Sequence, residues 1–96
     1  MRVRFRLEAA VDVEAARAWY DGQRRGLGED FVTSLEHVIQ LIVEFPEAFP
    51  EIGAGHRRAY LHRFPYAVYY RVDRDVVDVL ACLHGSRSPD VWHSRG

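Results

Sequence analysis

The sequence predicts a single α+β domain, in which a hairpin of two helices packs on one face of a mainly antiparallel sheet. Three observations predict it. Residues 2–7 alternate basic and apolar side chains, residues 12–45 have helical periodicity interrupted by glycines, and residues 57–84 contain three strand-like segments. The order is β-α-α-β-β-β, so the helices cover one sheet face and leave the other exposed. We expect residues 1–96 to form one domain.

The first strand is predicted from the alternation at residues 2–7. Successive side chains of a strand point to opposite faces, so the strand is half-buried. The expected buried side comprises Val3, Phe5 and Leu7. The opposite side, interpreted as a solvated strand surface, comprises Arg2, Arg4 and Arg6.

The first helix is expected to begin after Asp12, which can cap it, and to end at about Arg25. Val11 and Ala16 have the spacing of a hydrophobic staple at its start. The apolar stripe of this helix contains Val13, Ala16, Trp19 and Tyr20.

The second helix is predicted between Gly26-Leu27-Gly28 and Pro46, with Glu29 and Asp30 suiting its N-terminal dipole. Its apolar residues cover roughly half of the helix circumference, which is wider than one sheet would bury. Part of this arc is therefore expected to contact a neighbouring helix or a partner chain. The arc comprises Phe31, Leu35, Val38, Ile42 and Phe45, with Val32, Ile39 and Val43 beside them.

The C-terminal half is predicted to form the rest of the sheet. Residues 46–56 are rich in proline and glycine and are expected to form an irregular loop. Strands are then expected at residues 57–64, 66–72 and 76–84, the last two joined by a short hairpin at Asp73-Arg74-Asp75.

The charges are unevenly placed along the chain. The 96 residues include 13 basic and 14 acidic ones, for a formal net charge of −1, and every basic residue is arginine. Residues 1–55 contain 6 Arg and 10 acidic residues (net −4), whereas residues 56–96 contain 7 Arg and 4 acidic residues (net +3). This excludes a uniformly basic coat for nucleic acid but allows a local basic face.

Several classes of site are disfavoured. The single cysteine, Cys82, excludes an intramolecular disulfide and a multi-thiolate metal site, and fits a reducing compartment. The five histidines are not closely paired, and no phosphate-loop or Gly-x-Ser-x-Gly motif is present, so we expect no metal and no cofactor. No segment has the composition of a secretory signal or a membrane span, which predicts a soluble cytoplasmic protein without a membrane partner.

The remaining candidates are arginine, histidine and aromatic residues after residue 55, which are expected to converge on the uncovered sheet face. Arginine can bind phosphate, histidine can exchange a proton, and aromatic rings can stack on bases. The alternative is that they form the ordinary polar surface of an antiparallel sheet. These candidates are His56, Arg57, Arg58, Tyr60, His62, Arg63, Tyr69, Arg71, His84, Arg87, Trp92, His93 and Arg95.

Several segments occur in a familiar order and spacing across nearly the whole chain. They are Ala16-Arg17-Ala18-Trp19-Tyr20, Gly26–Phe31 running into Leu35, Pro46 with Phe49-Pro50, Arg57-Arg58 with Leu61–Val72, and His84–Pro89 with Trp92. Together they closely resemble the RelE/ParE superfamily of type II toxin–antitoxin toxins. The resemblance implies the same β-α-α-β-β-β fold that the residue patterns predict.

The superfamily contains two mechanisms. RelE-like toxins cleave mRNA in the ribosomal A site without a metal, using basic residues and a C-terminal aromatic residue, whereas ParE-like toxins inhibit DNA gyrase by binding it. Arg87 matches the family arginine after the last strand, but Ala67 stands where RelE-like proteins have an arginine, and the RelE lysines are missing. Trp92 lies near the position of the catalytic tyrosine but cannot transfer a proton. These differences favour the ParE-like branch.

The resemblance therefore implies a ParE-like toxin of the plasmid-stabilisation type, which causes growth arrest by acting on gyrase. It also implies a hetero-oligomer with a cognate antitoxin. Whether the protein is an enzyme is left open, and inhibition by binding is favoured. The expected target-binding residues are Arg57, Arg58, Tyr60, Arg63, Arg71, Arg87 and Trp92. The expected antitoxin-binding residues are Trp19, Tyr20, Phe31, Leu35, Ile39 and Ile42.

Two alternatives remain open. The first is a RelE-like ribosome-dependent mRNA endoribonuclease, whose catalytic candidates would be Arg87, His62, His84 and His93. The second is a degenerate toxin that retains only antitoxin binding.

Overall fold

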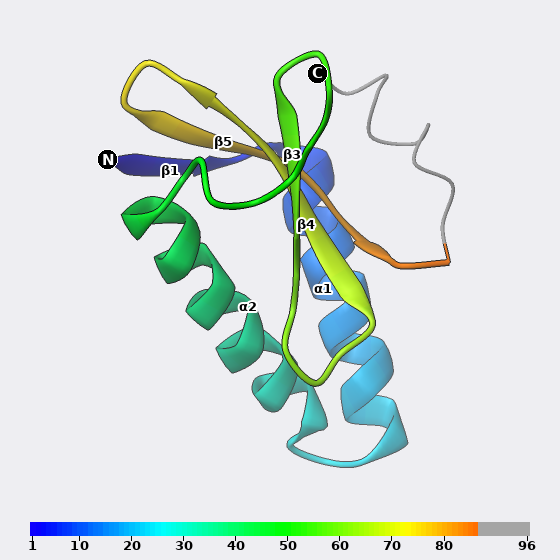
Figure 1. The fold of residues 1–96 in the computed structure, drawn as a ribbon. Coiled ribbons are helices and arrows are strands. Elements are labelled where there is room, and N and C mark those ends of the chain that lie inside the picture. Colours follow the sequence, from blue (N-terminus) through cyan, green and yellow to red (C-terminus); the bar gives the residue numbers. More distant parts are fainter. Residues whose placement is uncertain (87–96) are drawn as a thin grey trace.

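Two helices lie side by side against one face of a five-stranded sheet (Figure 1). The computed structural model describes residues 1–86. Its elements are β1 (Arg2–Phe5), α1 (Leu7–Gln23), α2 (Leu27–Glu44), β2 (Glu51–Gly53), β3 (His56–Tyr60), β4 (Tyr66–Asp73) and β5 (Val76–His84). Neither helix is long and apolar enough to cross a bilayer.

The strand order is β1-β5-β4-β3-β2. β1 pairs with β5 in parallel, and the other neighbours are antiparallel. The predicted α+β architecture, with a helical hairpin on one face of a mainly antiparallel sheet, is confirmed. The parallel pair places the N-terminal strand beside the C-terminal strand of the sheet, more than seventy positions away in sequence, as in the register pair Arg4 and Asp78.

The start of α1 differs from the prediction. The helix begins at Leu7, which is exposed rather than buried, and its first turn closes with a hydrogen bond of 3.0 Å from Ala10 N–H to the Arg6 carbonyl. Asp12 is therefore not the cap. It lies inside α1, where its carboxylate accepts a hydrogen bond of 3.1 Å from the backbone N–H of Cys82 in β5. Val11 is exposed, so the predicted staple with Ala16 is absent.

The connection between the helices depends on Asp21 and two glycines. Asp21 Oδ1 accepts hydrogen bonds from the backbone N–H groups of Gly26 (3.0 Å) and Gly28 (3.3 Å), which satisfies donors at the start of α2. Gly26 has a φ of 91°, a left-handed conformation that favours glycine. The predicted end of α2 before Pro46 is confirmed.

The strands are close to the predicted ones, with two differences. Residues 51–53 of the predicted loop form β2, which pairs with β3. β3 ends at Tyr60 instead of residue 64, and the chain then turns so that Leu61 N–H donates to the Tyr66 carbonyl at 2.9 Å. β5 has the predicted bounds, and Arg74 takes a positive φ of 59° in the hairpin turn.

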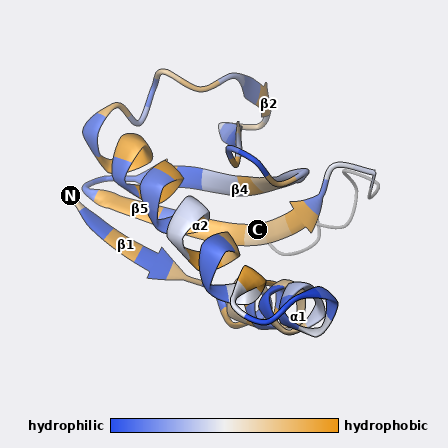
Figure 2. Cartoon of the chain, turned by 90° about the horizontal axis from the view of Figure 1, so that it is seen from below, coloured by the Kyte–Doolittle hydropathy of each residue, from blue (hydrophilic) through white to orange (hydrophobic). Residues whose placement is uncertain are grey.

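The main core lies between the helices and the sheet face that they cover, here termed the inner face. Tyr20, Phe31, Phe64 and Tyr66 form an aromatic cluster there, with Tyr20 and Phe31 stacked at a centroid distance of 5.5 Å. β5 is the most apolar strand, and Figure 2 shows it coloured mostly as hydrophobic. Burial of these side chains supplies the main stabilisation of the fold.

Candidate functional site

The sheet face opposite the helices, here termed the outer face, is organised as three rows of side chains that run across the strands. Paired residues of neighbouring strands point to the same face, so the register identifies each row. The rows are Arg4, Asp78, Arg71 and His56; then Ala81, Tyr69 and Arg58; then Leu83, Ala67 and Tyr60. The outer face therefore changes from charged to apolar along the strands.

Asp78 lies at the centre of the charged row and is 0% exposed. Its carboxylate accepts hydrogen bonds from Arg6 (2.9 Å from the terminal nitrogen) and Arg4 (3.3 Å from Nε), and a terminal nitrogen of Arg71 is 3.7 Å away. Burial alone would raise the pKa of Asp78, but the hydrogen bonds and charges of Arg6 and Arg4 outweigh it and lower the pKa to about 2. The carboxylate is therefore ionised at neutral pH.

The arginine row of the first strand is thus not a merely solvated surface, and that interpretation is wrong for Arg4 and Arg6. Both guanidinium groups pair with a buried carboxylate contributed by the neighbouring strand. The sequence could not show this, because Asp78 interrupts an otherwise apolar segment and its partners are remote in sequence. A single acidic residue inside the most apolar strand was the available signal.

The second and third rows of the outer face carry aromatic residues. The Arg58 guanidinium lies over the ring of Tyr60 at 5.1 Å, and Tyr60 is 54% exposed. Tyr69 is buried beside them, and burial raises the pKa of its hydroxyl while Arg58 opposes that rise. Ala67, Tyr69, Ala81 and Leu83 form a second buried cluster, against which Ile52 of β2 packs.

The expected target-binding residues are divided between three places. Arg58, Tyr60 and Arg71 lie on the outer face as predicted. Arg57 points to the inner side with its partner Tyr70, and it donates a hydrogen bond of 2.7 Å to the Phe49 carbonyl. Arg57 and Arg58 are adjacent in a strand, so they cannot share a face.

Arg63 lies in the β3–β4 connection rather than on a strand. It has a φ of 78°, and its guanidinium is 3.9 Å from the Asp30 carboxylate at the start of α2. Arg87 and Trp92, the last two expected target-binding residues, and Arg95 lie outside the described residues.

The histidines proposed for a nuclease do not share a site among the described residues. His62 lies beside α2, where its carbonyl accepts a hydrogen bond from Ser34 Oγ. His84 packs against Tyr66 at a centroid distance of 5.3 Å, in a hollow that Trp19 also lines. His93 lies outside the described residues, as does Arg87. Within residues 1–86, no group of His, Cys, Asp and Glu is arranged to hold a metal ion.

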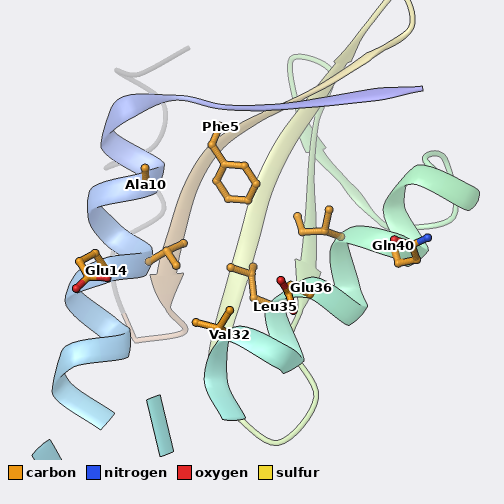
Figure 3. Close-up of a pocket in the computed structure, with 9 residues that line it drawn as sticks. Phe5, Ala10, Glu14, Val32, Leu35, Glu36 and Gln40 are labelled. Atoms are coloured by element: carbon orange, nitrogen blue, oxygen red, sulfur yellow. The ribbon is translucent and has the colours of Figure 1, made fainter. Parts of the chain in front are cut away.

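An apolar groove of about 530 Å³ opens between β1 and the two helices (Figure 3). Phe5 points from β1 into the space between α1 and α2, and Glu14 and Glu36 stand at the helices beside it. The apolar lining comprises Phe5, Ala10, Val13, Val32, Leu35 and Ile39. Sequence reasoning assigned Phe5 to a strand face and Val13 to a helix stripe, but it did not place them in one groove.

The residues expected to bind an antitoxin are also divided. Leu35 and Ile39 line the groove, whereas Phe31 and Ile42 are fully buried against the sheet. Because Phe31 and Ile42 face the core, a partner protein cannot reach them while the chain has this fold. The prediction that they bind an antitoxin is therefore corrected for these two positions. Trp19 is exposed and Tyr20 is half-buried, and both border a different hollow beside His84.

Comparisons with known proteins identify the family. Residues 3–89 match the model of the ParE toxin of type II toxin–antitoxin systems, parDE. Over 56 residues, or 58% of the chain, the sequence is 34% identical to Toxin ParE2 of Mycobacterium tuberculosis, in strains CDC 1551 and H37Rv. The aligned region is 53% of those proteins, so the chain spans about half the length of the curated relatives it matches.

A solved structure shows the same fold at lower sequence identity. It is described as the chromosomal ParDE TA system from P. aeruginosa, and it matches with a TM-score of 0.65 and 18% identity over 88% of this chain and 95% of that chain. The fold, with its helical hairpin on one face of the sheet, agrees with the family match, which spans most of the sequence. The chain belongs to the ParE toxin family of type II toxin–antitoxin systems.

Proposed function

We propose that this protein is a toxin that inhibits DNA gyrase by binding it and that is neutralised by a cognate antitoxin. The match of residues 3–89 to the ParE toxin family carries this proposal. The positions of the histidines support binding over RNA cleavage, because His62 and His84 border different hollows. Ala67 further supports it, since a buried methyl group on the outer face cannot stabilise a phosphorane.

The apolar groove is the proposed antitoxin site. Its lining from β1, α1 and α2 offers positions for several apolar side chains of a partner segment, and Glu14 and Glu36 would favour basic residues flanking that segment. A disordered antitoxin segment that folds on binding would suit such an open, preformed groove. Of the residues expected to bind an antitoxin, Leu35 and Ile39 line this groove, and the half-buried Ile39 is the more accessible of the two.

The gyrase proposal is tested by incubating the purified chain with gyrase and relaxed plasmid. We expect loss of supercoiling and accumulation of DNA breaks, with no new mRNA ends on translating ribosomes. Normal supercoiling together with A-site cleavage would establish the endoribonuclease instead. Normal supercoiling, intact mRNA and normal growth on expression would indicate a toxin that retains only antitoxin binding.

The groove is tested by co-expressing the toxin with its cognate antitoxin. Ile39→Glu places a charge in the groove, whereas Val11→Glu makes the same type of change on the exposed side of α1. We expect the Ile39→Glu toxin to stay toxic and to escape neutralisation, and the Val11→Glu toxin to remain neutralised. Retained toxicity shows that the variant folds. Full neutralisation of Ile39→Glu would place the antitoxin elsewhere.

A further inference from the structure

The charged row of the outer face gathers positive charge at a fixed position. Three guanidinium groups, from Arg4, Arg6 and Arg71, surround the carboxylate of Asp78, and the charge of Glu8 also acts on Arg6, so three positive charges meet two negative ones. The arginine side chains are 57%, 36% and 33% exposed, whereas Asp78 is 0% exposed. The charge of Asp78 is therefore internal, whereas the arginine side chains reach solvent.

Arg4 and Arg6 keep donors for a ligand even while they contact Asp78, because each contacts it through Nε and one terminal nitrogen. A guanidinium carries five N–H groups, so these two carry about ten, whereas one carboxylate has about four lone-pair positions. The carboxylate also offsets the mutual repulsion of the arginines and limits their rotamer freedom. An incoming anion thus meets guanidinium groups that are already oriented, which lowers the entropic cost of binding.

We propose that this arginine cluster of Arg4, Arg6 and Arg71, oriented by Asp78, binds the phosphodiester backbone of duplex DNA. Planar guanidinium groups match the oxygens of phosphate, and the cluster spans β1, β5 and β4, which suits an extended polyanion. An acidic protein segment fits less well, because Tyr69 and Leu83 of the same face are buried and the exposed ring of Tyr60 lies two rows away from the arginines.

This inference rests on the proposed function in one respect, because gyrase, the proposed target, itself binds DNA. A toxin bound to gyrase would then contact both the enzyme and the DNA strand next to it. DNA binding by the isolated chain is measured without gyrase, so either proposal can fail while the other stands.

The experiment measures binding of the full chain to a short labelled DNA duplex by fluorescence anisotropy over a range of salt concentrations. We expect Arg4→Gln and Arg71→Gln each to weaken binding and to reduce the slope of log K against log salt by about one unit. Arg25→Gln, at an exposed position in the turn between the helices, serves as the matched control and should change neither quantity.

Two variants that each remove one negative charge distinguish the orientation of the arginines from the overall charge of the chain. Asp78→Asn and Asp73→Asn each remove one negative charge, the first from the buried centre and the second from the exposed end of β4. We expect Asp73→Asn to strengthen DNA binding slightly and Asp78→Asn to weaken it, with folding of both checked by circular dichroism. The two arginine variants keep the test valid if Asp78→Asn does not fold.

Several outcomes would overturn the inference. They are absence of DNA binding at low salt, equal losses in Arg25→Gln and Arg4→Gln, and equal strengthening of DNA binding by both aspartate variants. Tighter binding of single-stranded RNA than of duplex DNA would identify RNA as the ligand. Displacement of DNA by poly-glutamate as readily as by polyphosphate would identify an acidic protein segment.

Discussion

At the scale of single residues, Asp78 determines the character of the outer face. It is fully buried in the most apolar strand, yet it is ionised because Arg4 and Arg6 donate hydrogen bonds to it. Breaking a buried ion pair by removing one partner leaves an uncompensated charge, which typically costs about 3–5 kcal/mol. Asp78 therefore couples the stability of the sheet edge to the placement of the arginines.

Asp78 should make the protein sensitive to acid. Its pKa is about 2 in the folded chain, below its ordinary value of 3.8, so its contribution to stability is fully present above about pH 4 and is lost as the pH falls through 2. We expect the free energy of unfolding of the wild type to fall by about 2 kcal/mol more than that of Asp78→Asn between pH 5 and pH 2. Urea titrations at a series of pH values measure this difference, and parallel pH profiles would contradict it.

At the scale of elements, the helical hairpin depends on close contact between α1 and α2. Gly28 is buried at the start of α2, and a Cβ atom there would lie 2.5 Å from the Arg17 carbonyl oxygen in α1. The sequence showed that Gly26-Leu27-Gly28 separates two helices, because glycine interrupts helical periodicity. It could not show that Gly28 is required for close packing rather than for the turn.

Gly28→Ala should destabilise the helical hairpin. The added methyl group collides with backbone, which cannot move as a flexible side chain can, so we expect a loss of about 1–3 kcal/mol in the free energy of unfolding. Gly22→Ala is the control, because no atom lies within 4 Å of the added Cβ near the end of α1. That change should be neutral or stabilise the chain by about 0.5 kcal/mol. Equal effects in urea unfolding of the two variants would argue against close packing at Gly28.

At the scale of the whole molecule, the core joins α1, the sheet and the N-terminal strand into one cooperative unit. Cys82 reports on that unit, since it is 1% exposed on the inner face and its backbone N–H donates to Asp12 of α1. Burial, with a smaller contribution from Asp12, raises the pKa of its thiol to about 12. A structural role as a small buried hydrophobic residue, which the sequence indicated, agrees with this environment.

The Cys82 thiol should react with a disulfide reagent only when the domain opens. Raising the pKa from 9.0 to about 12 lowers the thiolate fraction about a thousandfold, and burial blocks access as well. We expect labelling by Ellman's reagent to be slow in native buffer and to accelerate across the urea unfolding transition followed by circular dichroism. Rapid labelling under native conditions would show that α1 separates locally from β5.

The sequence by itself determined most of the elements. Alternation predicted β4 and β5, helical periodicity predicted the inner side of α2, and Pro46 predicted its end, because these features depend on the local backbone geometry of each segment. Strict alternation would also place Val77, Val79, Ala81 and Leu83 on one face of β5, but a register shift between β4 and β5 puts Val77 and Val79 on the inner face and Ala81 and Leu83 on the outer face. The expectation that the candidates after residue 55 converge on the uncovered face is met by Arg58, Tyr60 and Arg71 but not by Arg57, which points to the inner side. The start of α1 was missed because Asp12 has the chemistry of a cap but bonds instead to a strand remote in sequence.

Only the tertiary structure decided which arginines act together. Counting charges by sequence halves assigned Arg4 and Arg6 to the acidic half and Arg71 to the basic half. The pairing of β5 with β1 on one side and with β4 on the other brings all three to Asp78. The register between distant strands depends on how the helical hairpin returns the chain to the sheet and on how the core packs. No local pattern contains that information, so the arginine cluster and the apolar groove beside β1 emerge only in the folded chain.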